Sequence, residues 1–159
     1  ADVETALRET GLCRERLVLE ITEGMVLADD ARIGLDLTTL RASGVHVALE
    51  GYGTGYSGLT HLTRLPVDIL KLDRSLVSRI DRDRQARVLA ESLIGMGQAL
   101  GLDVVAEGVE TPAQLALLSA QGYGFAQGFL IGRPMPAADL AALLAEGVGS
   151  LWPGLVGQR

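Results

Sequence analysis

The sequence predicts an α/β fold in which about five parallel strands alternate with flanking helices. Five short apolar runs, rich in leucine and β-branched residues, are each bounded by turn residues, as strands are. Longer amphipathic stretches with helix-capping residues lie between these runs. This alternation is typical of βα units whose strands run parallel in one sheet. A doubly wound sheet fits this order, and so does part of a (β/α)8 barrel, which normally needs about 250 residues.

The strands are predicted from short apolar runs and the helices from their ends. The expected strands are residues 17–21, 45–49, 67–72, 103–106 and 124–131. Asp29 or Asp30 is a suitable N-cap for a helix that ends before Gly44, and Ser57 begins a short helix that has to end before Pro66. The other expected helices are residues 1–12, about 83–100, Thr111 and Pro112 up to Gly122, and Pro136 to Leu144.

The composition restricts the class of partner. The sequence contains 14 Lys and Arg residues and 20 Asp and Glu residues, which gives a net charge of −6. A nucleic-acid polymer or an anionic membrane requires a basic face, so neither is the expected main partner. No apolar run approaches the roughly 18 residues of a membrane span. The single Cys13 excludes a disulfide framework, and a cytoplasmic protein is therefore expected.

Polar residues stand at the carboxyl ends of all five expected strands. They are Glu20, Glu50, Lys71 with Asp73, Glu107 and Gln127. In each strand the polar residue lies two positions after an apolar residue, so the two side chains point to the same face of the sheet. All the polar residues can therefore face one common mouth. In parallel α/β folds this edge of the sheet carries the chemistry. Several carboxylates with one lysine suit a hard divalent cation such as Mg²⁺ or Mn²⁺.

A glycine-rich motif offers a competing interpretation. Residues 53–58 match the pattern G-x-G-x-x-G after a strand, and Asp73 follows at the spacing of a dinucleotide-binding fingerprint. The helix that follows is short and broken by Pro66, whereas a pyrophosphate-binding helix is usually long. The motif alone is therefore weak support for dinucleotide binding.

Five motifs in order resemble one known family. They are residues 19–23 (LEITE), 53–57 (GTGYS), 70–75 (LKLDRS), 105–110 (VAEGVE) and 127–128 (QG). Together they are similar to the EAL-domain family of cyclic di-GMP phosphodiesterases, and the resemblance extends to about Leu144. It implies a modified TIM barrel that hydrolyses one phosphodiester bond of cyclic di-GMP with Mg²⁺ or Mn²⁺. On this basis residues 1–146 are a truncated EAL domain and residues 147–159 a C-terminal tail.

The resemblance also implies a role for individual residues. Glu20, Glu50 and Asp73 would be metal ligands, and Lys71 and Glu107 would be the catalytic residues that position or activate the attacking water. Two metal ions would activate the water and neutralise the charge that develops on the phosphate. The remaining roles are loop bracing for Glu23 and substrate binding for Gln127, Gly128 and Pro134.

Two departures from the family pattern affect the expected activity. The family has two adjacent aspartates where this chain has Glu50 and Gly51, so one carboxylate is absent. The N-terminal part of the family, with the Glu-Ala-Leu motif and further metal ligands, is not in this sequence. An upstream sensor or cyclase-like domain is expected before Ala1. Because five strands do not close an eight-stranded barrel, residues 17–21 are expected to form an edge through which the chain dimerises or otherwise self-associates.

Three functions fit these observations. The favoured one is an EAL-family cyclic di-GMP signalling domain with weak or no phosphodiesterase activity, in which divalent metal binds weakly. The second is an active phosphodiesterase of which this chain is a fragment. The third is a non-catalytic cyclic di-GMP receptor or scaffold domain.

Overall fold

Five parallel strands form one sheet in the order β1-β2-β3-β4-β5. The computed structural model describes residues 3–22, 24–25, 31–53, 62–63 and 65–146. The strands are β1 (Val18–Thr22), β2 (His46–Tyr52), β3 (Ile69–Leu72), β4 (Asp103–Ala106) and β5 (Phe125–Ala126). Each strand pairs with the strands before and after it in the sequence, so β1 and β5 are the two outer strands of this sheet. The predicted fold, a partial TIM-type barrel of about five parallel strands, is confirmed.

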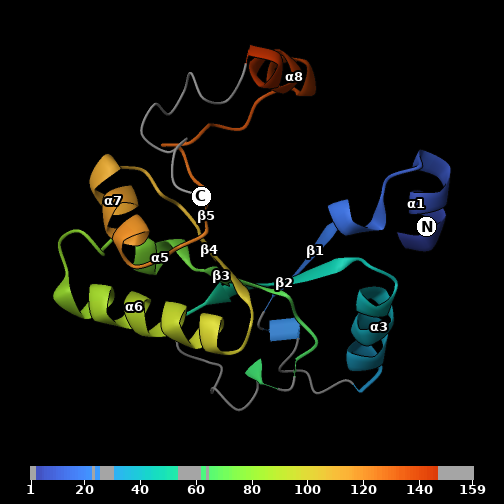
Figure 1. Cartoon of the computed structure of the whole chain (residues 1–159), viewed down its shortest axis with the longest axis horizontal. Helices are drawn as coiled ribbons and strands as arrows, with labels where there is room; N and C mark the ends of the chain where they lie inside the picture. Colours follow the sequence, from blue (N-terminus) through green and yellow to red (C-terminus); the bar gives the residue numbers. More distant parts are fainter. Residues whose placement is uncertain (1–2, 23, 26–30, 54–61, 64, 147–159) are drawn as a thin grey trace.

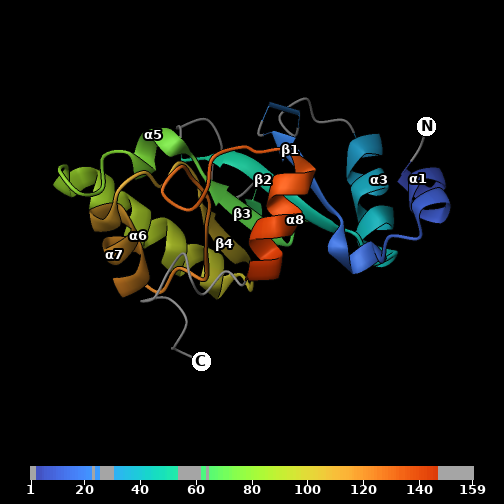
Figure 2. The same ribbon diagram turned by 90° about the horizontal axis from the view of Figure 1, so that it is seen from above.

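The helices connect the strands and flank them. They are α1 (Val3–Thr10), the 3-10 helix η1 (Arg14–Arg16), α3 (Ala31–Ala42), α5 (Arg74–Val77), α6 (Arg84–Ala99), α7 (Pro112–Ala120) and α8 (Ala137–Glu146). In Figure 1, α3 and α6 lie below the strands, whereas α8 lies above them. Seen from above, α8 lies in front of the strands (Figure 2). No helix among the described residues is long and apolar enough to cross a membrane.

Side-chain caps explain where two of the helices begin. The carboxylate of Asp83 accepts hydrogen bonds from the backbone N–H of Gln85 and Ala86 at the start of α6. Thr111 and Gln114 form a reciprocal capping box at the start of α7, with Pro112 as its first residue. These caps satisfy backbone donors that have no partner within the helix. The predicted starts of both helices are confirmed, while Asp29, Asp30 and Ser57 lie outside the described residues.

The fifth strand is much shorter than predicted. Residues 124–131 were expected to be extended, but only Phe125 and Ala126 pair with β4. The chain then wraps around Val109, whose N–H donates to the carbonyl of Gln127 and whose carbonyl accepts from the N–H of Leu130, both at 3.0 Å. The N–H groups of residues 131 and 132 donate to the carbonyl of Gly128, which makes a turn. The predicted strand was therefore wrong over residues 127–131, because these residues form a turn that is hydrogen-bonded to Val109.

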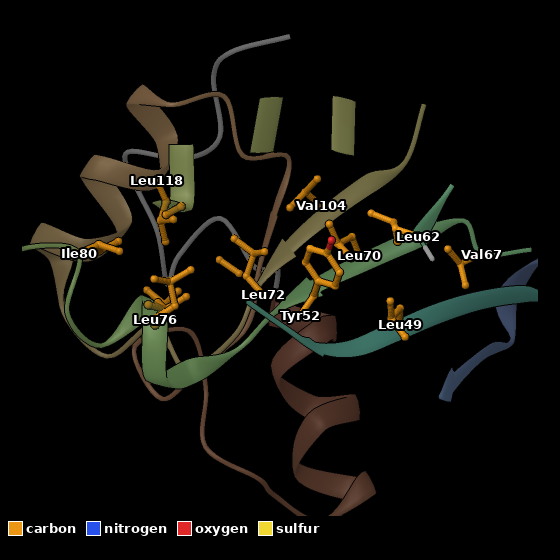
Figure 3. Close-up of a cluster of buried hydrophobic side chains, with 14 of the residues drawn as sticks. Leu49, Tyr52, Leu62, Val67, Leu70, Leu72, Leu76, Ile80, Val104 and Leu118 are labelled. Carbon is orange, nitrogen blue, oxygen red and sulfur yellow. The ribbon is translucent and has the colours of Figure 1, made fainter. Parts of the chain in front are cut away.

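One hydrophobic core joins the strands to the helices that flank them. Leu70 on β3 and Val47 on β2 are fully buried, and so is Leu118 on α7. Figure 3 shows Leu70 and Leu118 in the same cluster with Val104 of β4. The outer strand β1 is covered less well, because Val18 keeps 41% of its surface exposed. The core therefore fixes β2 to β4 firmly, and β1 remains an accessible edge, as predicted.

Candidate functional site

Three charged side chains meet near the carboxyl ends of three strands. Lys71 projects from β3, Glu20 from β1, and Glu107 from the residue directly after β4. The Nζ atom of Lys71 lies 2.5 Å from Oε1 of Glu20 and 2.6 Å from Oε1 of Glu107. We call these three residues the Lys71 cluster. The parity of the strands predicted that these side chains share a mouth, and the structure brings them together.

The contact between Glu20 and Lys71 reaches across a whole strand of the sheet. β2 lies between β1 and β3, so the contact from Glu20 to Lys71 spans β2. Glu20 is paired in register with Ala48 of β2, which is fully buried and has only a methyl side chain. Ala48 is in register with Ile69 of β3, two residues before Lys71, so the contact crosses β2 obliquely.

The members of the Lys71 cluster differ in burial. The side chain of Lys71 is only 6% exposed, that of Glu107 is 16% exposed and that of Glu20 is 47% exposed. Burial by itself would lower the pKa of Lys71, but the hydrogen bonds and the negative charges of Glu107 and Glu20 outweigh burial, so its pKa is raised. Lys71 is therefore a fully charged ammonium group at neutral pH.

Asp73 has a structural contact of its own. It is the N-cap of α5, and its carboxylate accepts a hydrogen bond of 2.7 Å from the backbone N–H of Ser75. One of its oxygens is thereby directed to the helix. Among the described residues, no hydrogen bond or ion pair joins Asp73 to the Lys71 cluster.

Glu50 and Gly51 lie at an irregularity of β2. The pairing of β2 with β3 is regular at Leu49 and Leu70, but the register has shifted where Tyr52 meets Leu72. Glu50 and Gly51 therefore lie opposite the single residue Lys71, as in a β-bulge. Gly51 has a φ of 78°, a left-handed conformation that favours glycine. Glu50 is half-buried there.

The three residues expected to bind substrate line one cavity. Gln127, Gly128 and Pro134 all contribute to a cavity of about 500 Å³ between the segment after β5 and helix α8. Its other lining residues are mostly apolar and include Phe129, Met135, Leu140 and Leu144. Glu20, Lys71 and Glu107 do not line it. The charged cluster and this apolar cavity thus share no lining residue. Glu23 lies outside the described residues.

Sequence reasoning missed the contribution of α8 and of Arg133 to this cavity. Arg133 lines the cavity, and its guanidinium lies 4.5 Å from the centre of the Phe129 ring, a cation–π contact. The apolar residues around Phe129 were read as a strand. The available signal was the set of chain breakers in this segment, since Gly128, Pro134 and Pro136 interrupt any regular element.

The fold and the site together define a class of protein. Parallel βα units with a charged cluster at the carboxyl ends of the strands are typical of TIM-type α/β domains. The model of the EAL domain family matches residues 1–134. The chain belongs to the EAL domain family, whose members include cyclic di-GMP phosphodiesterases.

Two curated relatives come from Pseudomonas aeruginosa. The bifunctional diguanylate cyclase/cyclic di-GMP phosphodiesterase MucR is 40% identical over 90% of this chain and 21% of its own length. The cyclic di-GMP phosphodiesterase NbdA is 44% identical over 90% of this chain and 18% of its own length. The chain thus spans about a fifth of these relatives.

Solved structures agree with the family. The crystal structure of the EAL domain of Mycobacterium smegmatis DcpA is 41% identical and superposes with a TM-score of 0.85, over 91% of this chain and 65% of that one. A manganese and cyclic di-GMP complex of Klebsiella pneumoniae BlrP1 is 35% identical with a TM-score of 0.77, over 82% of this chain and 33% of that one. Divalent metal and cyclic di-GMP are therefore ligands within this family.

The acidic residues that the structure describes do not form a prepared metal centre. Two carboxylates of the expected site, those of Glu20 and Glu107, are bound to the ammonium group of Lys71. Asp73 caps a helix, and position 51 carries no side chain. In the part of the chain that the structure describes, no three residues of the types His, Cys, Asp and Glu are grouped closely enough to hold a metal ion. A two-metal site requires more oxygen ligands than this arrangement supplies.

Proposed function

We propose that this chain is a cyclic di-GMP signalling domain of the EAL family whose own phosphodiesterase activity is weak or absent. The observation that carries the proposal is the state of positions 50 and 51. The family's paired aspartates are replaced by Glu50 and by Gly51, which adopts a left-handed conformation opposite Lys71. Hydrolysis depends on metal ions that neutralise the developing charge, and a missing ligand should lower the rate more than a thousandfold.

Under this proposal Mg²⁺ or Mn²⁺ binds weakly. Lys71 and Glu107, the expected catalytic pair, are present and in contact, so the arrangement retains part of the family's machinery. Glu20, Glu50 and Asp73, the expected metal ligands, are not gathered around a common point in the described structure. The domain would comprise residues 1–146, and the single cysteine fits a reducing cytoplasm.

The receptor function has support of its own from the apolar cavity. A cavity of about 500 Å³ lies within the usual size range for small-molecule sites, and Gln127, Gly128 and Pro134 all line it. A domain that retains this surface while losing metal ligands would bind cyclic di-GMP and convey the bound state to a partner domain. The active phosphodiesterase is the alternative in which residues outside this sequence supply the missing ligands.

The test is a product assay combined with a binding measurement. The 159-residue chain is incubated with cyclic di-GMP and excess Mg²⁺ or Mn²⁺, and the linear dinucleotide is quantified by chromatography. We expect no steady turnover. Calorimetric titration with cyclic di-GMP, without metal, then separates a receptor from a domain that does not bind. Steady formation of the linear dinucleotide would overturn the proposal.

A further inference from the structure

An arginine links the segments that follow two neighbouring strands. Arg74 is the first residue of α5 and directly follows Asp73, which comes after β3. Its Nη2 atom donates to Oε1 of Glu110 at 2.7 Å, and Glu110 lies between β4 and α7. Because β3 and β4 pair in the sheet, this ion pair joins the two segments at the same edge. It connects the segment that begins with Asp73 to the one that begins with Glu107.

The stem of Arg74 lies over Gly108. A Cβ atom at position 108 would lie 2.3 Å from Cγ of Arg74 and 2.8 Å from its Cβ, so a larger residue there would force Arg74 to move. Gly108 directly follows Glu107 in the chain. Arg74 thus meets the segment 107–110 at two places, by packing at Gly108 and by an ion pair at Glu110.

Backbone hydrogen bonds hold the segment 107–110 from other directions. Three of its N–H groups donate, from Glu107 to the carbonyl of Leu72 at 3.1 Å, from Val109 to that of Gln127 at 3.0 Å, and from Glu110 to Oε1 of the buried Gln114 at 2.8 Å. The bond to Leu72 joins the start of the segment to β3. Arg74 joins its far end to the residues just after β3.

The exposure of the ion pair indicates what it contributes. The side chains of Arg74 and Glu110 are 64% and 43% exposed. An exposed ion pair adds little to overall stability, because water screens the charges and two long side chains have to be ordered. We therefore expect the contact to order this segment locally, with little effect on the rest of the sheet.

We infer that Arg74 is a positioning residue for Glu107, which it holds in place through Gly108 and Glu110. The inference deepens the proposed function, on which it rests, because Glu107 is one of the two catalytic residues expected there. Arg74 acts through the backbone of the segment 107–110. Neither Arg74 nor Glu110 is an expected metal ligand, so the contact should persist when Mg²⁺ or Mn²⁺ is added.

Amide hydrogen exchange tests the local effect. NMR would measure the exchange of the N–H groups of Glu107, Val109 and Glu110 in the unmodified chain and in Arg74→Met. We expect all three to exchange at least tenfold faster in the variant, because the segment opens locally, while the N–H groups of β4 keep their rates. Unchanged rates in the segment, or an equal rise in β4, would overturn the inference.

A side-chain signal reports on the carboxylate of Glu107 itself. Lys71 is the only lysine in the sequence, and its Nζ atom lies 2.6 Å from Oε1 of Glu107. In a chain labelled with ¹⁵N-lysine and without added metal, Arg74→Met should shift the single Nζ signal. The matched control is Arg79→Met, which removes another exposed arginine, paired with Asp83. An Nζ signal that stays in place in Arg74→Met would show that Glu107 keeps its position without Arg74, and the inference would be wrong.

The conservative variant separates the charge from general disruption. Arg74→Lys keeps a positive charge and a stem over Gly108, so the segment should retain slow exchange. Exchange as fast as in Arg74→Met would contradict the role of the ion pair. Steady turnover of cyclic di-GMP would overturn the proposed function alone, since these measurements contain no nucleotide.

Discussion

Gly128 lies directly against the backbone of Val109. A Cβ atom at position 128 would overlap with the main-chain atoms of Val109, which are themselves fixed by hydrogen bonds to Gln127 and Leu130. The substrate-binding role expected for Gly128 stays a prediction. The contact with Val109 gives a separate, structural reason for glycine at this position.

Replacement of Gly128 by alanine should destabilise the chain. Because the obstacle is backbone and not a flexible side chain, one of the two segments has to move, at a cost of about 1–3 kcal/mol. Urea unfolding would measure this loss. The control is Gly124→Ala, where a Cβ meets no atom within 4 Å and the change should stay within about 0.5 kcal/mol. Equal stability of the two variants would contradict the prediction.

The carboxylate of Asp68 should make the stability depend on pH. Its Oδ1 accepts from Nε and Nη2 of Arg41 on α3, at 2.9 and 2.6 Å, and its Oδ2 accepts from the N–H of Val47 on β2 at 2.9 Å. Burial would raise the pKa of Asp68, but the Arg41 and Val47 contacts and the nearby His46 outweigh it and lower the pKa. A lowered pKa stabilises the fold above the ordinary carboxylate value of about 3.9, and this contribution is lost as the pH falls through the folded pKa.

Asp68→Asn should therefore cost about 1–2 kcal/mol at neutral pH, because it removes the charge that holds Arg41. The difference from the unmodified chain should shrink as the pH falls below about 4. Thermal unfolding from pH 3 to pH 7 measures both effects. Asp36→Asn, on the exposed side of α3, is the control and should behave like the unmodified chain. A difference that persists unchanged at pH 3 would refute this assignment.

A second carboxylate at position 51 should strengthen metal binding. No atom lies within 4 Å of a Cβ built on Gly51, so an aspartate fits, although the φ of 78° adds a strain of about 1–2 kcal/mol. The double variant Glu50→Asp with Gly51→Asp offers Mn²⁺ a second carboxylate next to the one at position 50. Calorimetry should show at least a tenfold gain over the matched variant Glu50→Asp with Gly51→Ala, which has the strain without the charge. Equal affinities would mean that the loss at position 51 does not limit metal binding.

The outer strand β1 should promote self-association. An outer strand has N–H and C=O groups that are free to pair with another chain, and Val18 on β1 is 41% exposed. Sedimentation velocity at increasing concentration should show growth beyond the monomer, and Val18→Lys should reduce it. The control is Val88→Lys, at an equally accessible position on α6 that is 52% exposed. A monomer at tens of micromolar would disprove the prediction, and inhibition by Val88→Lys alone would locate the contact on α6.

The parts of the fold that follow from local chemistry could be predicted from the sequence. Thr111 with Pro112 marked the start of α7, because a cap and a first-turn proline act over a few residues. After Ala126, the chain breakers in the sequence indicate that a regular strand is interrupted, but they do not predict the turn, which depends on hydrogen bonds with the distant Val109. Likewise, strand parity brought Lys71 and Glu107 to one mouth, but the contact of Lys71 with Glu20 depends on the strand order, in which β2 lies between β1 and β3.

The order of the strands bears on how the chain folds while it is being synthesised. Since neighbours in the sheet are also neighbours in the sequence, every strand from β2 onward finds its first partner already made when it leaves the ribosome. Each pairing closes a loop of 16 to 30 residues, which costs less chain entropy than a pairing between the two ends of the sheet would. The described sheet can therefore grow from β1 toward β5 during translation, because each of its strands after β1 has a partner that precedes it in the sequence.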